Sequence, residues 1–140
     1  MFVLDTNVLS ELRRPERANP QLLAWASGTP TARLFLSAIS LMEIEMGVLR
    51  VERRDTAQGA VLRAWLNAQV LPTFEDRVLV VDAAVALRCA GLHVPDPRSE
   101  RDALIAATAL VHGMTVVTRN LADFAPTGVA LLNPWDQATP

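Results

Sequence analysis

The sequence predicts an α/β fold in which a mostly parallel central sheet of about five strands carries helices on both faces. Two observations lead to this fold class. Short apolar runs of strand length alternate along the 140 residues with longer segments that place apolar residues at helical spacing. Most consecutive strands are separated by a helical segment, which is the usual connection between parallel neighbours.

The strands are predicted where short segments rich in Val, Leu, Ile and Phe are bounded by acids or turn formers. They cover residues 2–4, 33–38, 78–81, 114–118 and 129–132. Helices are predicted over residues 6–13, 20–27, 40–54, 56–70, 82–91 and 99–112, with a single turn at 120–124. Pro15 stops the first helix, and Asn19 followed by Pro20 opens the second. Gly113 is expected to end the last long helix as its C-cap.

The length favours one domain over residues 1–140, with a polar tail at 133–140 that is expected to fray. The apolar share is 51%, yet no run approaches the roughly 18 apolar residues of a membrane span. The chain opens on a strand and an acid without a basic leader, so neither a signal peptide nor a membrane partner is expected. Cys89 is the single cysteine, which excludes a disulfide framework and favours the reducing cytoplasm.

The basic residues have an unusual composition, because all 13 are arginine and lysine is absent. This absence excludes mechanisms that need a catalytic or phosphate-binding lysine, including P-loop chemistry, Schiff bases and receiver-type phosphoacceptor sites. The net charge of −2 argues against non-specific binding of nucleic acids.

Four acids occupy matching places at the ends of predicted strands and the starts of helices. Asp5 follows the first strand, Glu43 the second and Asp123 the fourth, while Asp102 begins the helix before the fourth strand. Parallel strands bring their carboxyl ends to one sheet edge, where α/β folds place their sites. We therefore expect the four carboxylates to converge.

Two interpretations of these acids stay open at this point. Ser40, Ser99 and Asn120 each stand three residues before an acid, a spacing typical of a capping box, so three of the acids can be helix caps. Four converging carboxylates would instead repel one another unless a hard divalent cation neutralised them. An all-carboxylate set suits Mg²⁺ or Mn²⁺ rather than Zn²⁺. Of the two histidines, His112 is expected to be a cap or surface residue.

Four segments resemble the PIN-domain ribonucleases, and most closely the VapC toxins of bacterial toxin–antitoxin pairs, in the subgroup that includes FitB. They are residues 4–12 (LDTNVLSEL), 39–44 (ISLMEI), 102–109 (DALIAATA) and 117–124 (VTRNLADF). Each motif is weak alone, but the four occur in order over nearly the whole chain.

The resemblance implies a three-layer α/β/α PIN-like fold and a sequence-selective endoribonuclease that depends on one or two Mg²⁺ or Mn²⁺ ions. By position, the catalytic and metal-binding acids are Asp5, Glu43, Asp102 and Asp123, supported by the hydroxyls of Thr6 and Thr118 and the amide of Asn120. It also implies tRNA or rRNA as the substrate class. The partners it implies are a homodimeric copy and a VapB-like antitoxin, which forms a higher assembly and often sends an arginine into the acidic groove.

The chemistry expected from these residues is hydrolysis by water. A metal held by Asp5 and Asp102, with or without Asp123, lowers the pKa of a bound water and polarises a phosphoryl oxygen. Glu43 either binds a second ion or acts as the base. Products with 5′-phosphate and 3′-hydroxyl ends are therefore expected.

Arginines near the first strand are the candidate RNA contacts. Arg13 and Arg14 lie one short helix from Asp5, and either phosphate contact or a solvated helix end explains them. Trp25, Trp65, Leu62 and Leu66 are expected in the core, with an apolar groove for a partner as the alternative.

Two other functions compete with the nuclease. One is a phosphotransfer domain of the HAD or receiver type, which expects an aspartate at position 7 and a lysine. Position 7 holds an asparagine. The other is a protein-interaction module without catalysis, in which the acids are only caps.

Overall fold

The computed structural model describes residues 1–136 and contains one five-stranded sheet with the strand order β3-β2-β1-β4-β5. All neighbouring strands are parallel, with Phe2 opposite Leu34 and Val3 opposite Val116. The strands are β1 (Phe2–Leu4), β2 (Leu34–Ser37), β3 (Val78–Leu79), β4 (Thr115–Val117) and β5 (Leu131–Leu132). The predicted α/β fold with a parallel sheet of about five strands is confirmed.

The helices follow the predicted order, and the bounds differ by a few residues. They are α1 (Thr6–Leu12), α2 (Pro20–Gly28), α3 (Ala38–Arg54), α4 (Thr56–Trp65), α5 (Leu71–Thr73), α6 (Ala83–Leu92), α7 (Glu100–His112) and α8 (Leu121–Phe124). The short turns are the 3-10 helices η1 (Pro15–Arg17), η2 (Thr31–Arg33), η4 (Ala125–Thr127) and η5 (Pro134–Asp136), and the π-helix η3 (Leu66–Val70). Within residues 1–136, no helix is both long enough and apolar enough to cross a membrane.

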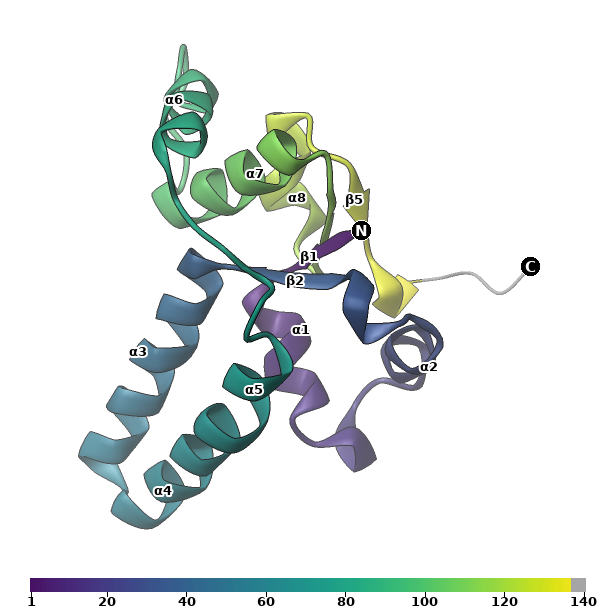
Figure 1. Ribbon diagram of the computed structural model, residues 1–140, viewed down its shortest axis with the longest axis vertical. Helices are drawn as coiled ribbons and strands as arrows, with labels where there is room; N and C mark the ends of the chain where they lie inside the picture. Colours follow the sequence, from purple (N-terminus) through teal and green to yellow (C-terminus); the bar gives the residue numbers. More distant parts are fainter. Residues whose placement is uncertain (137–140) are drawn as a thin grey trace.

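Helices cover both faces of the sheet, giving three layers (Figure 1). Leu4 and Val117 point into one core, which α1, α3 and the segment from α4 to α5 close. Val3 and Val116, one residue earlier on each strand, point into the opposite core with the buried face of α7. This alternation is the two-residue period of strands. Helix α6 packs outside, on α7.

Helix α3 begins two residues before the predicted start at Ser40. Ser37 is its N-cap, with an extended backbone and a hydroxyl that accepts from the backbone N–H of Ile39 at 3.0 Å. Ser40 therefore lies inside the helix, where its buried side chain donates to the carbonyl of Leu4 at 3.5 Å. Because Ser37 already occupies the N-cap position, Ser40 has no cap to form.

The expectation that the chain frays from Asn133 is wrong for residues 133–136. Trp135 is only 7% exposed and packs in the same core as Leu4 and Val117, on that face of the sheet. Its indole N–H donates to Glu11 at 3.0 Å, and the Asn133 side chain accepts from its backbone N–H at 2.9 Å. The tail was predicted to fray because most of its residues are polar. Its one large apolar side chain, Trp135, nevertheless packs in the core and holds residues 133–136 in place. The remaining predicted tail, 137–140, lies outside the described residues.

Helices α3 and α4 form a close antiparallel pair that extends from the sheet (Figure 1). Arg63 of α4 joins them through Glu45 at 2.6 Å and Glu52 at 3.0 Å. Gly59 is buried where the helices meet, and a Cβ there would lie 2.5 Å from Glu52 Cα. The hairpin therefore requires a residue without a side chain at position 59.

Gly59→Ala is expected to destabilise the protein by about 1–3 kcal/mol, because a methyl group would force the two backbones apart. Chemical denaturation followed by circular dichroism measures the change. Gly47→Ala is the matched control, since Gly47 is also helical and a Cβ added to it would have nothing within 4 Å. That variant should gain about 0.5–1 kcal/mol from helix propensity. Equal stability of Gly59→Ala and wild type would contradict the close approach.

Candidate active site

Asp5 lies buried at the carboxyl end of β1, beside the end of β4. Its backbone N–H donates to Val117 at 2.9 Å. One carboxylate oxygen accepts from the backbone N–H of Thr6 at 2.8 Å, and the other accepts from the Thr118 hydroxyl at 2.8 Å. Asp5 is thus the N-cap of α1. The sequence shows no capping-box pattern at Asp5, and its carboxylate nevertheless caps the helix through the backbone N–H of Thr6.

Thr118 connects Asp5 to the loop after β4. Its hydroxyl donates to Asp5 and accepts from the backbone N–H of Asn120 at 3.0 Å. The predicted support from Asn120 therefore comes through its backbone, since its side chain is exposed and forms no cap. The loop after the strand thereby fixes, through Thr118, the carboxylate of a residue more than 110 positions earlier.

Glu43 reaches the same site from the first turns of α3. Its Oε1 accepts from the Thr6 hydroxyl at 2.9 Å, and its Oε2 lies 3.6 Å from Nη1 of Arg101. Thr6 therefore links two of the predicted acids, because its backbone contacts Asp5 while its side chain contacts Glu43. Both oxygens of Glu43 face a donor.

The electrostatics bring Asp102 and Asp123 into the same group. Burial raises the pKa of Asp102, and the charges of Asp5, Asp123 and Glu43 raise it further. A side-chain interaction with Ser99 lowers the same pKa by a smaller amount. Burial likewise raises the pKa of Asp5, opposed by its hydrogen bonds and reinforced by Glu43 and Asp123. Asp102 is half-buried and Asp123 is exposed. The charges of Glu43 and Asp123 therefore reach both Asp5 and Asp102.

The capping-box interpretation does not hold for the three acids that allowed it. Ser40 is inside α3 and caps nothing, so Glu43 has no cap to complete. Ser99 and Asn120 occupy N-cap positions, yet neither side chain makes a capping hydrogen bond. Glu43, Asp102 and Asp123 are thus not explained by helix capping.

The donor set fits a hard divalent cation chemically. It consists of carboxylates and hydroxyls, and the pKa of both Asp5 and Asp102 is raised, first by burial and then by the charges of neighbouring acids. As oriented, however, no three acidic, histidine or cysteine side chains within residues 1–136 are gathered closely enough to hold an ion. The oxygens of Asp5 and Glu43 instead face threonine, backbone and arginine donors.

A groove between α1, α3 and α4 opens beside Glu43. It is lined by Thr6, Ser10, Arg13, Glu43, Ile44, Gly47, Val48, Val51, Leu62 and Trp65. Burial lowers the pKa of Arg13, and the neighbouring Arg14 lowers it further. Arg14 does not line this groove. Leu66 is fully in the core, whereas Leu62, Trp65 and Trp25 are only partly buried against it.

One further prediction concerns a histidine. His112 is exposed at the end of α7, as expected for a surface residue, and His93 accepts from the backbone N–H of Arg98 at 3.2 Å.

Sequence reasoning missed Arg101, which lies next to Asp102 in the first turn of α7. The only signal was a basic residue adjacent to a predicted acid, and the helical offset of about 100° per residue argued against a shared direction.

The chain is similar to a protein family, to individual toxins and ribonucleases, and to a solved structure. The PIN domain family model matches residues 2–126. The VapC ribonuclease Y4jK of Sinorhizobium fredii is 36% identical, with 99% of this chain and 100% of the relative covered. Toxin FitB of Neisseria gonorrhoeae is 35% identical over 96% of this chain and 99% of its own. The crystal structure of FitAcB from the same organism superposes with a TM-score of 0.89 at 34% identity, covering 98% of this chain and 100% of the other.

Proposed function

The chain belongs to the PIN-domain family, and on that premise we propose that it is an endoribonuclease toxin of a type II toxin–antitoxin pair. Its substrate class is structured RNA, either tRNA or rRNA, and its reaction is hydrolysis of a phosphodiester bond. Two relatives of full length support this by name, one as a ribonuclease and one as a toxin. The observation that supports the proposal is that Thr6 contacts both Asp5 and Glu43, while burial and the charges of neighbouring acids raise the pKa of Asp5 and Asp102.

The proposed cofactor is Mg²⁺ or Mn²⁺, in one or two copies. Asp5, Glu43, Asp102 and Asp123 would hold it, because carboxylate oxygens are the ligands these cations take in proteins. When bound, the cation would polarise a phosphoryl oxygen and lower the pKa of a water molecule.

The protein's own residues would orient the site and move the proton. Thr6 and Thr118 hold Asp5 by both oxygens, so its carboxylate has one orientation at the end of β1. Thr6 also fixes Oε1 of Glu43. We assign Glu43 as the group that accepts a proton from the attacking water at Oε2, since the ion-pair partner of that oxygen is an exposed guanidinium that can move away.

The RNA backbone would follow the groove beside Glu43. Arg13 lines this groove together with Thr6, and its guanidinium could pair with a phosphate in two-pronged geometry. Arg14 is proposed as a weaker contact, because it lies outside the groove-lining set. With no tyrosine in the chain, selection of the RNA would rest on shape and polar contacts rather than on stacking.

The proposed protein partners are a VapB-like antitoxin and a second copy of the chain, which together would form a higher assembly. The partly buried Leu62 and Trp65 give the groove an apolar side on which an amphipathic segment could dock. Glu43 at its end offers a carboxylate to an incoming arginine.

Cleavage of bulk tRNA in Mg²⁺ or Mn²⁺ is expected to give fragments with 5′-phosphate and 3′-hydroxyl ends, because water attacks rather than the ribose 2′-hydroxyl. The fragments should accept a radioactive 5′-phosphate from polynucleotide kinase only after phosphatase treatment. Recovery of 2′,3′-cyclic phosphate would exclude hydrolysis by water. The absence of cleavage of both bulk tRNA and ribosomal RNA would exclude the nuclease itself.

A further inference from the structure

Arg101 brings a positive charge to the acidic edge, the part of the molecule that carries Asp5, Glu43, Asp102 and Asp123. Among residues 1–136, its ion pair with Glu43 is the only one that involves any of the four acids. The pair joins the first turn of α7 to α3, with 3.6 Å between Nη1 and Oε2. Because Asp102 follows Arg101 directly, this guanidinium stands between the two helices that supply Glu43 and Asp102.

The geometry makes this ion pair easy to exchange. The Arg101 side chain is 46% exposed and makes no hydrogen bond within the described residues. A separation of 3.6 Å is longer than a charge-assisted hydrogen bond, and exposed pairs are weak in water. The fork of guanidinium N–H donors is therefore available to another anion.

A positively charged side chain near these carboxylates favours the entry of an RNA strand. Carboxylates repel a phosphodiester, and because lysine is absent from the sequence, arginine is the side chain that can oppose this repulsion beside a bound cation. Arginine also matches the oxygens of a phosphate in a two-pronged arrangement that Glu43 does not form with it here.

We propose that Arg101 binds a phosphate of the RNA strand, exchanging Glu43 for that phosphate when substrate enters. The exchange places a positive charge beside the bond to be cut and leaves Oε2 of Glu43 without a counter-ion. The inference rests on the proposed nuclease function and adds a substrate-binding residue to it.

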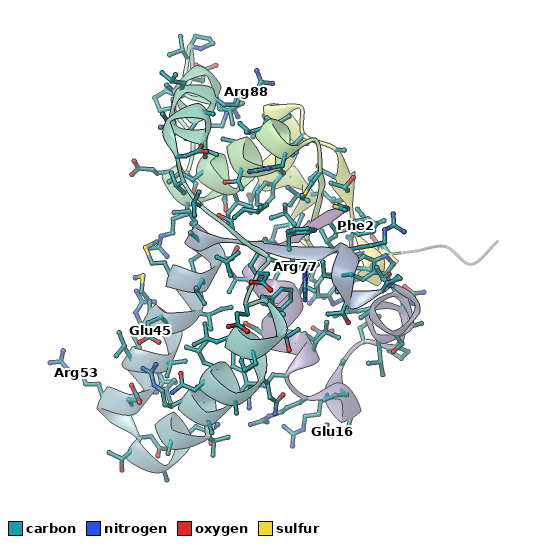
Figure 2. The ribbon with its side chains drawn as sticks, in the orientation of Figure 1. Phe2, Glu16, Glu45, Arg53, Arg77 and Arg88 are labelled. Atoms are coloured by element: carbon teal, nitrogen blue, oxygen red, sulfur yellow. The ribbon has the colours of Figure 1, made fainter. Side chains whose placement is uncertain are left out.

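Binding is tested without cleavage, in an Asp5→Asn background with fluorescently labelled bulk tRNA and Mg²⁺. Adding Arg101→Gln is expected to weaken binding about tenfold and to reduce the slope of log K against log salt by about one. Arg101→Lys should recover part of the affinity, because it keeps the charge but not the fork. Arg53→Gln is the charge-matched control, since Arg53 lies at the end of α3 farthest from the sheet (Figure 2), and it should bind as its parent does.

Cleavage by the single variant separates the alternatives. Arg101→Gln in the wild-type background is expected to raise KM for tRNA about tenfold while kcat changes less. Unchanged binding with a lower kcat would mean that Arg101 only holds Glu43, and a faster variant would mean that it obstructs the site. Either result overturns the inference while leaving the nuclease intact. If the wild type cleaves no RNA, the proposed function fails as well, which is a distinguishable outcome.

Discussion

Asp5→Asn is expected to lower RNA cleavage at least 100- to 1,000-fold, roughly the loss typical of removing one charge-stabilising group from a catalytic site. Asp5 is the buried centre of the acidic edge, held by Thr6 and Thr118. Asparagine keeps an oxygen that can accept from the Thr6 backbone, so the cap of α1 is preserved while the charge is lost. The measurement is the rate of tRNA cleavage by purified protein in Mg²⁺ or Mn²⁺.

Asp82→Asn is the matched control for this variant. Asp82 is also a helix N-cap, accepting from the backbone N–H of Val85 at 3.0 Å, but it caps α6. It should cleave RNA at the wild-type rate. Equal activity of Asp5→Asn and Asp82→Asn would mean that Asp5 is a cap and nothing more.

Asp102→Asn is expected to raise the melting temperature of the metal-free protein by a few degrees and to abolish its stabilisation by Mg²⁺. The folded-state pKa of Asp102 is raised, first by burial and then by the charges of Asp5, Asp123 and Glu43. A group with a raised pKa contributes stability below its unfolded pKa, and this contribution is lost as the pH rises through the folded pKa. At neutral pH the ionised carboxylate therefore destabilises the fold, and asparagine removes that cost.

The pH dependence checks the sign of this effect. In EDTA, the difference between Asp102→Asn and wild type should shrink as the pH falls through the raised pKa, because wild type then takes up the proton. Thermal melts between neutral and acidic pH measure it. Asp76→Asn, at an exposed position outside the site, should follow wild type throughout. A variant less stable than wild type in EDTA at neutral pH would show that Asp102 is a structural acid.

Local patterns predicted the strands and most helix ends because the residues that set them act over one turn. Asn19 caps α2, Asp82 caps α6, and Gly113 adopts φ 66° at the end of α7, each as its residue type suggests. The predicted start of α3 was wrong because Ser37 and Ser40 have the same capping chemistry. Which of the two serines caps α3 depends on where β2 ends, and β2 ends at Ser37.

Long-range contacts explain what local patterns could not predict. Trp135 is fixed by Glu11, and Arg101 reaches Glu43 across two helices; neither pairing has a periodic signal. The helix predicted over 56–70 continues to Thr73 and is not uniform, since the π-helix Leu66–Val70 separates α4 from α5. For the acids, the sequence left capping and metal binding both open. Ser40 lies inside α3, and the side chains of Ser99 and Asn120 make no capping hydrogen bond, which argues against the first.

The four acids are proposed to form the cation site of a nuclease. The most direct test titrates Mg²⁺ or Mn²⁺ into wild type and Asp5→Asn while following both the melting temperature and tRNA cleavage. We expect wild type to gain stability and activity over the same cation range, EDTA to abolish both gains, and Asp5→Asn to show neither. If the cations neither stabilise wild type nor support cleavage, and Asp5→Asn behaves identically, the chain is an interaction module and not a nuclease.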